Sequence, residues 1–280
     1  MKKIPVRHIH ATQKELNATE SFGIQDIHTM LAGKDMVQEL HRHDFYYILA
    51  LKKGAGHHEI DFTPYPISNH TVFFMRPGQV HQLTLAAGST GYMMQFNKDF
   101  YAPHDILRST LSTAHYAPDA VSFQKLLTIL KDIFQEDTDK QTQYVDVIKA
   151  NMQIFFIELT RKNNSQPAPD GNLYIYQQLE SFLALLEKHI SEHKQVAQYA
   201  DMLHLSTYQL NAITKTTLGK TCSETINEYM ILEAKRNLLA TSGQISQIAD
   251  LLGYEDVSYF IRFFKKHTGH TPEAFRHHFK

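Results

Sequence analysis

Residues 245–279 read ISQIADLLGYEDVSYFIRFFKKHTGHTPEAFRHHF, and this stretch determines how the second half of the chain folds. Apolar side chains recur in its first part at i, i+3, i+4 and i+7: Ile245, Ile248, Ala249 and Leu252. This spacing places them on one face of a short helix. Gly253 can then supply a tight bend into a second helix, predicted over Val257–His267. The stretch therefore predicts two helices that cross steeply.

The second of these helices has an apolar side and a polar side. Its phenylalanines, Phe260, Phe263 and Phe264, lie at i, i+3 and i+4 and are expected in the core. The opposite side presents Ser258, Ile261, Arg262, Lys265 and Lys266. From Ser258 to the C-terminus the basic residues are Arg262, Lys265, Lys266, Arg276 and Lys280, against the single acid Glu273. This pattern is compatible with a DNA-binding surface and equally with the solvated face of a helical bundle.

The same unit occurs once before in the chain. Val196, Tyr199, Ala200 and Leu203 repeat the apolar spacing 49 residues earlier, and Gly219-Lys220-Thr221 corresponds to Gly269-His270-Thr271. A single helical hairpin cannot bury its apolar face, so two of them are expected to share a core. The repeat predicts a pair of helix-turn-helix units.

The region 245–279 closely resembles the signature of the AraC/XylS family of bacterial transcription regulators. Matching elements are the I-x-x-I-A run, the glycine with Tyr254, the F-x-R-x-F-K-K run and the final G-x-T-P-x-x-F-R. Glu228–Leu239 resembles the family's long connecting helix, although Leu232–Glu233 stand where an arginine is usual. The resemblance covers about residues 173–280 and implies an all-α domain with two helix-turn-helix units.

The resemblance also implies which residues contact DNA. Its two recognition helices correspond to Thr207–Leu218 and Val257–His267. The implied contact residues are Tyr208, Asn211, Lys215, Val257, Ser258, Tyr259, Arg262, Lys265 and Lys266. Arg262 can pair with guanine and Asn211 with adenine. Ala212 replaces a common arginine and Thr214 a usual core phenylalanine, so the second unit is expected to make more of the base contacts.

Short apolar runs separated by turn residues fill the chain from about residue 20 to 96. The predicted strands are Phe45–Leu51, His58–Phe62, Thr71–Met75, Val80–Leu85 and Tyr92–Phe96. Glycines, asparagine and prolines, among them Pro64 and Pro66, lie between them. Such spacing is typical of a sandwich or a small barrel.

Helical periodicity replaces this pattern further along. Helices are predicted over Val121–Phe134 and Val145–Arg161, and the polar, proline-containing run Asn163–Gly171 resembles a linker. We therefore predict an α+β chain of two domains. Its expected parts are a β-barrel (1–105), a helical dimerisation segment (106–162), a linker (163–172) and the helix-turn-helix domain (173–280).

The segment Glu39–Leu83 resembles the cupin-type sensor domain that many members of this family carry. His41 and His43 match its H-x-H strand, and His81 matches the histidine of its P-G-x-x-H strand. Cupin enzymes add a glutamate, but that position falls near Tyr47–Ile48, which leaves Glu59 as a possible substitute. Three imidazoles alone could hold zinc or iron. They could equally form hydrogen bonds in the barrel or line a polar pocket.

We predict a ligand site made of His41, His43, Tyr46 and His81, with no metal, no cofactor and no catalytic residue. The barrel is expected to fold without a metal. Two histidine pairs, His57–His58 and His277–His278, are expected to be solvated. No nucleophile motif, phosphate-binding glycine loop or carboxylate pair is present in the sequence.

Length, charge and cysteine content exclude several classes of protein. With 280 residues, the chain is long enough for two domains with cores of their own. Its net charge of −1 excludes a uniformly basic nucleic-acid binder but permits a local basic patch. Cys222 is the single cysteine, which excludes a disulfide framework. The sequence has neither a run of about 20 apolar residues nor the pattern of a signal peptide, so a cytoplasmic protein is expected.

Together with these patterns, the resemblance implies a sequence-specific transcriptional regulator, an activator controlled by a small-molecule effector bound in the barrel. Its expected partners are promoter DNA, the effector, RNA polymerase and a second copy of the chain, with no membrane. One alternative is a cupin-type metalloenzyme fused to a DNA-binding domain. A second alternative is a constitutive DNA-binding dimer without an effector.

Overall fold

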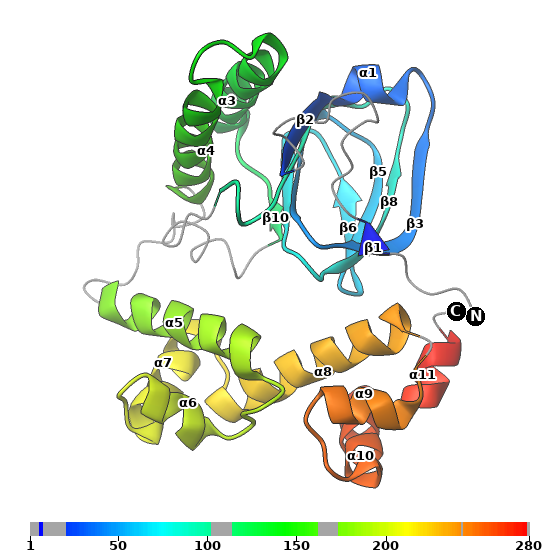
Figure 1. Cartoon of the computed structure of the whole chain (residues 1–280), viewed down its shortest axis with the longest axis vertical. Coiled ribbons are helices and arrows are strands. Elements are labelled where there is room, and N and C mark those ends of the chain that lie inside the picture. Colours follow the sequence, from blue (N-terminus) through cyan, green and yellow to red (C-terminus); the bar gives the residue numbers. More distant parts are fainter. Residues whose placement is uncertain (1–5, 8–20, 102–113, 162–172, 242, 279–280) are drawn as a thin grey trace. The chain divides into compact units, whose positions relative to one another are not determined.

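The chain divides into two compact units, one within residues 5–167 and one within residues 168–280. The structure, a computed structural model, describes residues 6–7, 21–101, 114–161, 173–241 and 243–278 (Figure 1). The first unit combines β-sheets with long helices, and the second is helical. The predicted linker, 163–172, lies outside the described residues.

Two five-stranded sheets form the first unit. Their strands are β1 (Val6–Arg7), β2 (Phe22–Asp26), β3 (Met36–His43), β4 (Tyr46–Lys53), β5 (Gly56–Ile60), β6 (Thr63–Ile67), β7 (Thr71–Met75), β8 (Val80–Leu85), β9 (Thr90–Phe96) and β10 (His115–Tyr116). One sheet has the order β1-β3-β8-β5-β6 and the other β10-β7-β4-β9-β2. All pairs are antiparallel except β1 with β3.

Strand β4 is buried on both faces and therefore separates two apolar cores. Tyr47, Leu49 and Leu51 belong to a core shared with β8 of the other sheet. Ile48 and Ala50 face the opposite way, into a core formed with the long helices. Because both faces are covered, the run FYYILAL shows no polar alternation.

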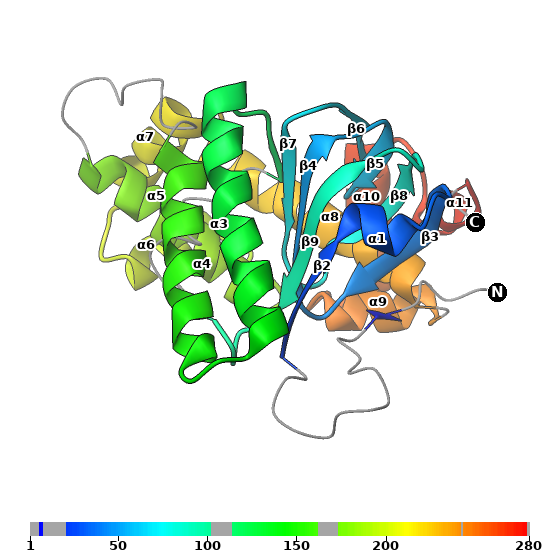
Figure 2. The ribbon, with the colours of Figure 1, turned by 90° about the horizontal axis from the view of Figure 1, so that it is seen from above.

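The long helices cover the outer face of the sheet that contains β4. They are α3 (Ala120–Asp139) and α4 (Tyr144–Arg161), and a short helix α1 (Ile27–Leu31) follows β2. Phe123 and Leu130 of α3 and Phe155 and Phe156 of α4 are buried in the shared core. Figure 2 shows α3 and α4 side by side along one side of the barrel. Both helices were predicted from their spacing.

Strand β6 differs from the prediction, which placed Pro64 and Pro66 in a break between strands. Here Pro64 pairs with Glu59 and Pro66 with His57, so the prolines lie inside a strand. Strand β6 ends its sheet in the described part of the chain. Proline has no N–H to donate. A strand at the edge of a sheet tolerates proline because it pairs with a neighbour on one side alone.

The second unit consists of helices joined by short turns. They are α5 (Leu173–His189), α6 (Val196–Met202), α7 (Thr207–Leu218), α8 (Cys222–Ala240), α9 (Ile245–Leu251), α10 (Val257–Thr268) and α11 (Pro272–His278). The pairs α6–α7 and α9–α10 are the two predicted helix-turn-helix units, and α8 connects them. In the described part of the chain, no helix is both long and apolar enough to cross a membrane.

The bend after α9 depends on Gly253, as the sequence predicts. Its φ of +70° is left-handed, and a Cβ at this position would lie 1.8 Å from the carbonyl oxygen of Ser191. The Nζ of Lys194 donates hydrogen bonds to the carbonyls of Gly253 (2.7 Å) and Ser191 (3.0 Å). The bend after α6 has His204 at the matching position, with φ +55°.

Candidate functional site

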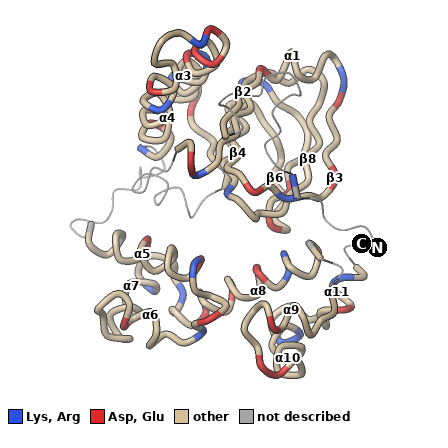
Figure 3. The backbone as a smooth tube through the Cα atoms, in the orientation of Figure 1, with Lys and Arg blue, Asp and Glu red and all other residues tan. Residues whose placement is uncertain are grey.

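Helix α10 presents its polar side to solvent. It begins at Asp256, which accepts a 2.7 Å hydrogen bond from the backbone N–H of Ser258, and ends at Gly269. Phe260 and Phe264 are buried, as predicted, while Phe263 is half-buried. Among the contact residues predicted on this helix, Val257 is half-buried. The other five are exposed: Ser258, Tyr259, Arg262, Lys265 and Lys266. Figure 3 marks Lys and Arg positions in blue along α10.

Arg262 forms an ion pair with Asp256, the residue that caps the start of its helix. Its Nη2 lies 3.7 Å from Oδ2 of Asp256, and both side chains are more than 60% exposed. An exposed ion pair of this kind contributes at most about 1 kcal/mol. The guanidinium can therefore exchange this partner for a guanine or a phosphate at little cost.

Two members of the expected basic patch are not part of the described surface. Arg276 is 7% exposed, and its Nε donates a 3.0 Å hydrogen bond to the carbonyl of Leu238. It holds α11 against α8, so its assignment to the patch was wrong. Lys280 lies outside the described residues. Within the described residues, the basic patch predicted from Ser258 onward therefore consists of Arg262, Lys265 and Lys266.

Helix α7 presents fewer charged side chains to solvent than α10 does. Ser206 and Gln209 form a capping box at its start. Tyr208 is 82% exposed, Lys215 and Ala212 are exposed, and Thr214 is buried where the family resemblance expects phenylalanine.

The amide of Asn211, which is predicted to contact a base, is hydrogen-bonded within the helical unit. Its Nδ2 donates to the carbonyl of Thr207 and its Oδ1 accepts from the backbone N–H of Cys222, both at 3.0 Å. The N–H groups in the first turn of a helix have no partner within that helix, and Asn211 supplies one at the start of α8. The side chain is half-buried, and both ends of its amide are hydrogen-bonded inside the protein. A contact with adenine would have to replace these two bonds.

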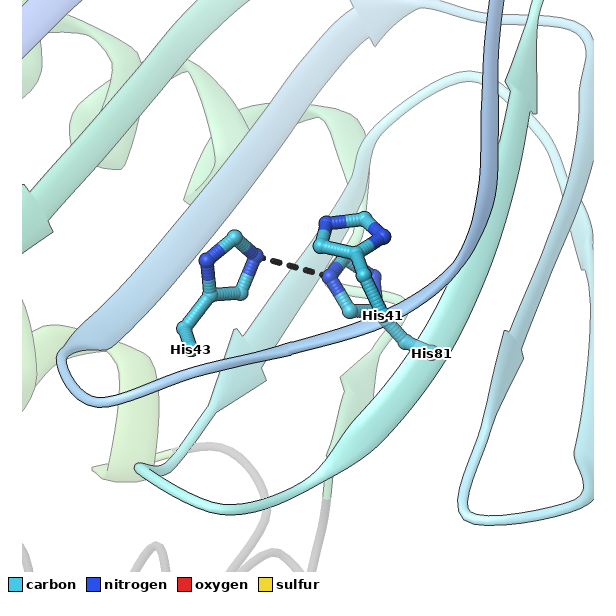
Figure 4. Close-up of side chains that lie close together, drawn as sticks. All are labelled: His41, His43 and His81. Carbon is cyan, nitrogen blue, oxygen red and sulfur yellow. Dashed lines mark hydrogen bonds between the residues drawn. The ribbon is translucent and has the colours of Figure 1, made fainter. Parts of the chain in front are cut away.

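The three predicted barrel histidines lie together between the sheets. His41 and His43 come from β3 and His81 from the neighbouring β8, where His41 and His81 are direct partners. All three are buried, with exposed fractions of 1%, 6% and 2%. The Nε2 atoms of His43 and His81 are 2.8 Å apart, and the ring of His41 lies 4.1 Å from that of His81 at an angle of 47° (Figure 4).

A fourth imidazole, that of His58, belongs to the same cluster, although the sequence prediction placed it in solvent. His58 on β5 is fully buried, and its Nε2 lies 2.9 Å from Nδ1 of His81. Strand residues alternate between faces, so His58 and Ile60 point inward while His57 and Glu59 do not. This alternation with Ile60 was the signal that could have identified His58.

Glu59 does not complete a cupin-type ligand set. It is half-buried on the outward face of β5 and accepts a 3.0 Å hydrogen bond from Nε2 of Gln82. The strand places it away from the face that carries His58, because neighbouring side chains alternate.

Tyr46 is also not part of the histidine cluster. Its ring stacks on Phe96 at 5.1 Å and Phe74 at 5.9 Å, in the core beneath the long helices. Tyr47 points the other way and lies parallel to His43, with ring centres 5.4 Å apart. The prediction chose the wrong neighbour because β4 is apolar on both faces.

Burial keeps the clustered imidazoles neutral. Loss of solvent contact lowers the pKa of His41 to about 4, despite a hydrogen bond from its ring to the Glu39 carbonyl. Burial, with the positive charge of neighbouring groups, lowers the pKa of His43 and of His58 to about 3. The same causes lower the pKa of His81 further. At neutral pH these rings offer lone pairs as well as N–H donors.

Both units match known domains. Residues 28–144 match the AraC-like ligand binding domain, and residues 199–278 match a helix-turn-helix domain. The chain belongs to the AraC/XylS family of transcriptional regulators. Its first unit is the family's cupin-like ligand-binding domain, and its second is the DNA-binding domain with two helix-turn-helix units.

Relatives within the AraC/XylS family match most of the chain. The HTH-type transcriptional activator RhaS of Pectobacterium atrosepticum is 26% identical over 252 residues, covering 85% of this chain and 87% of its own. RhaS of Yersinia pestis is 24% identical over 249 residues, covering 84% and 88%. A solved structure of ToxT from Vibrio cholerae, bound to an unsaturated fatty acid, is 20% identical with a TM-score of 0.44, covering 94% and 96%.

Proposed function

We propose that this AraC/XylS-family regulator activates transcription from promoter DNA when a small-molecule effector binds in its barrel. The observation that carries the DNA-binding part is the exposed side of α10. There Arg262, Lys265 and Lys266 project from a helix whose other side is anchored by Phe260 and Phe264. The relatives called RhaS are named transcriptional activators, which supports activation rather than repression.

The proposed DNA surface comprises both recognition helices. The proposed contact residues are Tyr208, Lys215, Val257, Ser258, Tyr259, Arg262, Lys265 and Lys266. Asn211 is left out because its amide is already hydrogen-bonded within the unit. We expect α7 and α10 to enter adjacent major-groove segments about 34 Å apart, one turn of the double helix. Lysines in such a surface contact phosphates, and Arg262 reads a base.

The effector site is proposed at the buried histidines. The proposed site keeps three residues predicted from the sequence, His41, His43 and His81. It includes Tyr47 and His58 in place of Tyr46, because Tyr47 lies against His43 and His58 lies within hydrogen-bond distance of His81. An effector can switch the protein only if it binds one arrangement of the chain more tightly than another. We expect His43→Ala to alter the response to the effector.

The remaining partners are RNA polymerase and a second copy of the chain. Apolar side chains that α3 and α4 leave exposed, Val121, Val147 and Ile154, support a dimer through these helices. We place the protein in the cytoplasm, where promoter DNA is found, and assign it no enzymatic activity, since the named relatives are regulators.

In vitro selection of DNA sites with the purified full-length chain tests this function directly. We expect one enriched sequence, strong salt dependence of binding, and transcription by added RNA polymerase from a promoter that carries the site. Lys98→Ala, a change in the barrel unit, is the matched control for Lys265→Ala. Failure to enrich any sequence would overturn the proposal. A thermal-shift screen of metabolites then identifies the effector, and the absence of any stabilising compound favours a constitutive dimer.

A further inference from the structure

The buried histidines can do more than line a pocket. We infer that His41, His43 and His81 form a binding site for a divalent transition-metal ion, held by their three Nε2 atoms. One ring nitrogen from each residue lies within 4.8 Å of those from the other two, and all three side chains are buried. The sequence alone predicts no metal here, because the glutamate of the cupin enzymes is missing.

Hydrogen bonds at the far side of two rings favour Nε2 as the ligand atom. The Nδ1 of His41 lies 2.7 Å from the carbonyl oxygen of Glu39, which can only accept, so Nδ1 carries the proton and Nε2 the lone pair. The Nδ1 of His81 lies 2.9 Å from Nε2 of His58, which can accept in the same way. Metal-bound histidines almost always donate their second N–H to such a partner.

The Nε2 atoms of His43 and His81 are nearly as far apart as an ion requires. Zinc–nitrogen bonds of about 2.0–2.1 Å in a tetrahedral site place two ligand nitrogens about 3.4 Å apart. The Nε2 atoms of His43 and His81 are 2.8 Å apart. The distance between these two atoms must therefore increase by about 0.6 Å to admit the ion, and small rotations of the two rings can provide this increase.

The donor set indicates the class of metal. Three neutral imidazoles suit zinc, iron, cobalt or nickel, whereas magnesium and calcium prefer oxygen. Tyr47 stands near the place of the enzymes' glutamate, and Glu59 points outward, so the described residues leave the fourth position for water or an anion. Arg7, paired with His43 in the register of β1 and β3, opposes a cation, but its exposure allows water to screen the charge.

The test titrates Co²⁺ into the metal-free full-length protein and follows the visible absorption of nitrogen-bound cobalt. We expect a saturable spectrum at one ion per chain that Zn²⁺ displaces. His43→Ala and His81→Ala should abolish it. His58→Gln should weaken binding about 10- to 100-fold, because His58 orients His81. His57→Ala, on the exposed face of the same strand, is the matched control and should bind normally.

A second candidate group in the helical unit must be separated from this site. His189, Glu192 and His193 also lie close enough to hold an ion. The proposal fails if wild-type protein shows no cobalt spectrum, or if His193→Ala removes the spectrum while His43→Ala retains it. Circular dichroism and thermal unfolding check the fold of each variant. Metal binding in the barrel does not depend on DNA binding by the helical unit, so either can fail alone.

Discussion

Oδ1 of Asn211 accepts a hydrogen bond from the backbone N–H of Cys222, 3.0 Å away, and thereby joins the first recognition helix to the start of α8. Asn211→Ala removes this bond and leaves a helix N–H without its partner. We expect the free energy of unfolding to fall by about 0.5–2 kcal/mol, as for the loss of other helix caps. Urea denaturation measures it. Base preference, measured on single-base variants of the selected site, should not change.

Arg262 is the exposed side chain of α10 whose guanidinium can donate two parallel hydrogen bonds to one base. Arg262→Ala is expected to weaken binding to the selected site by about 1–3 kcal/mol and to relax preference at one base pair. The same panel of single-base variants measures both effects. Equal weakening on every sequence would instead assign Arg262 to a phosphate.

Lys265 and Lys266 lie on the exposed side of α10, where phosphate contacts are expected. Either change to alanine should weaken binding similarly on all sequences and lower the slope of log K against log salt by about one. Binding measured by anisotropy at several salt concentrations gives the slope. A new base preference with an unchanged slope would contradict the assignment.

The buried histidines make the barrel sensitive to acid. Burial lowers the pKa of His41 from 6.5 to about 4 and that of His58 to about 3. Between pH 6.5 and these values the unfolded chain binds protons that the folded chain does not. Stability is therefore fully present above pH 6.5 and declines as the pH falls, by up to about 1.4 kcal/mol per pH unit for each such imidazole. Urea denaturation on both sides of pH 6.5 tests this, and equal stability would refute it.

Gly253 and His204 occupy matching left-handed positions in the two bends. Gly253→Ala is expected to destabilise the helical unit by more than about 1 kcal/mol, because its Cβ would overlap the Ser191 carbonyl. His204→Gly should change stability by less than about 1 kcal/mol, since relief of the strained backbone and the greater freedom of unfolded glycine oppose each other. Thermal unfolding compares the two variants.

Helices α3, α4 and α10 were predictable because local spacing defines them, whereas the limits of α7 were implied by the family resemblance. The expected limits of α7 match those observed, and those of α10 differ by one residue at its end. Side-chain direction was predictable where polar and apolar residues alternate. The direction of Tyr46 was predicted wrongly because β4 is buried on both faces. The residues on its two faces are equally apolar, so the sequence does not show which face Tyr46 lies on.

Contacts between distant elements could not be predicted from local patterns. Arg276 reaches the carbonyl of Leu238 across 38 positions of the chain, and a basic residue near a basic helix gives no sign of this. Asn211 is similar, because its partner Cys222 belongs to the next helix. Polar side chains that satisfy backbone groups of another element depend on how helices dock, which one sequence does not specify.

The prolines of β6 have a consequence for how the protein behaves in a crowded solution. An open strand edge offers N–H and C=O groups on which a second chain can add a strand, the first step toward aggregation. Pro64 and Pro66 have no N–H, so this edge cannot provide a continuous ladder. They protect the sheet that holds the histidines from growing by strand addition at β6.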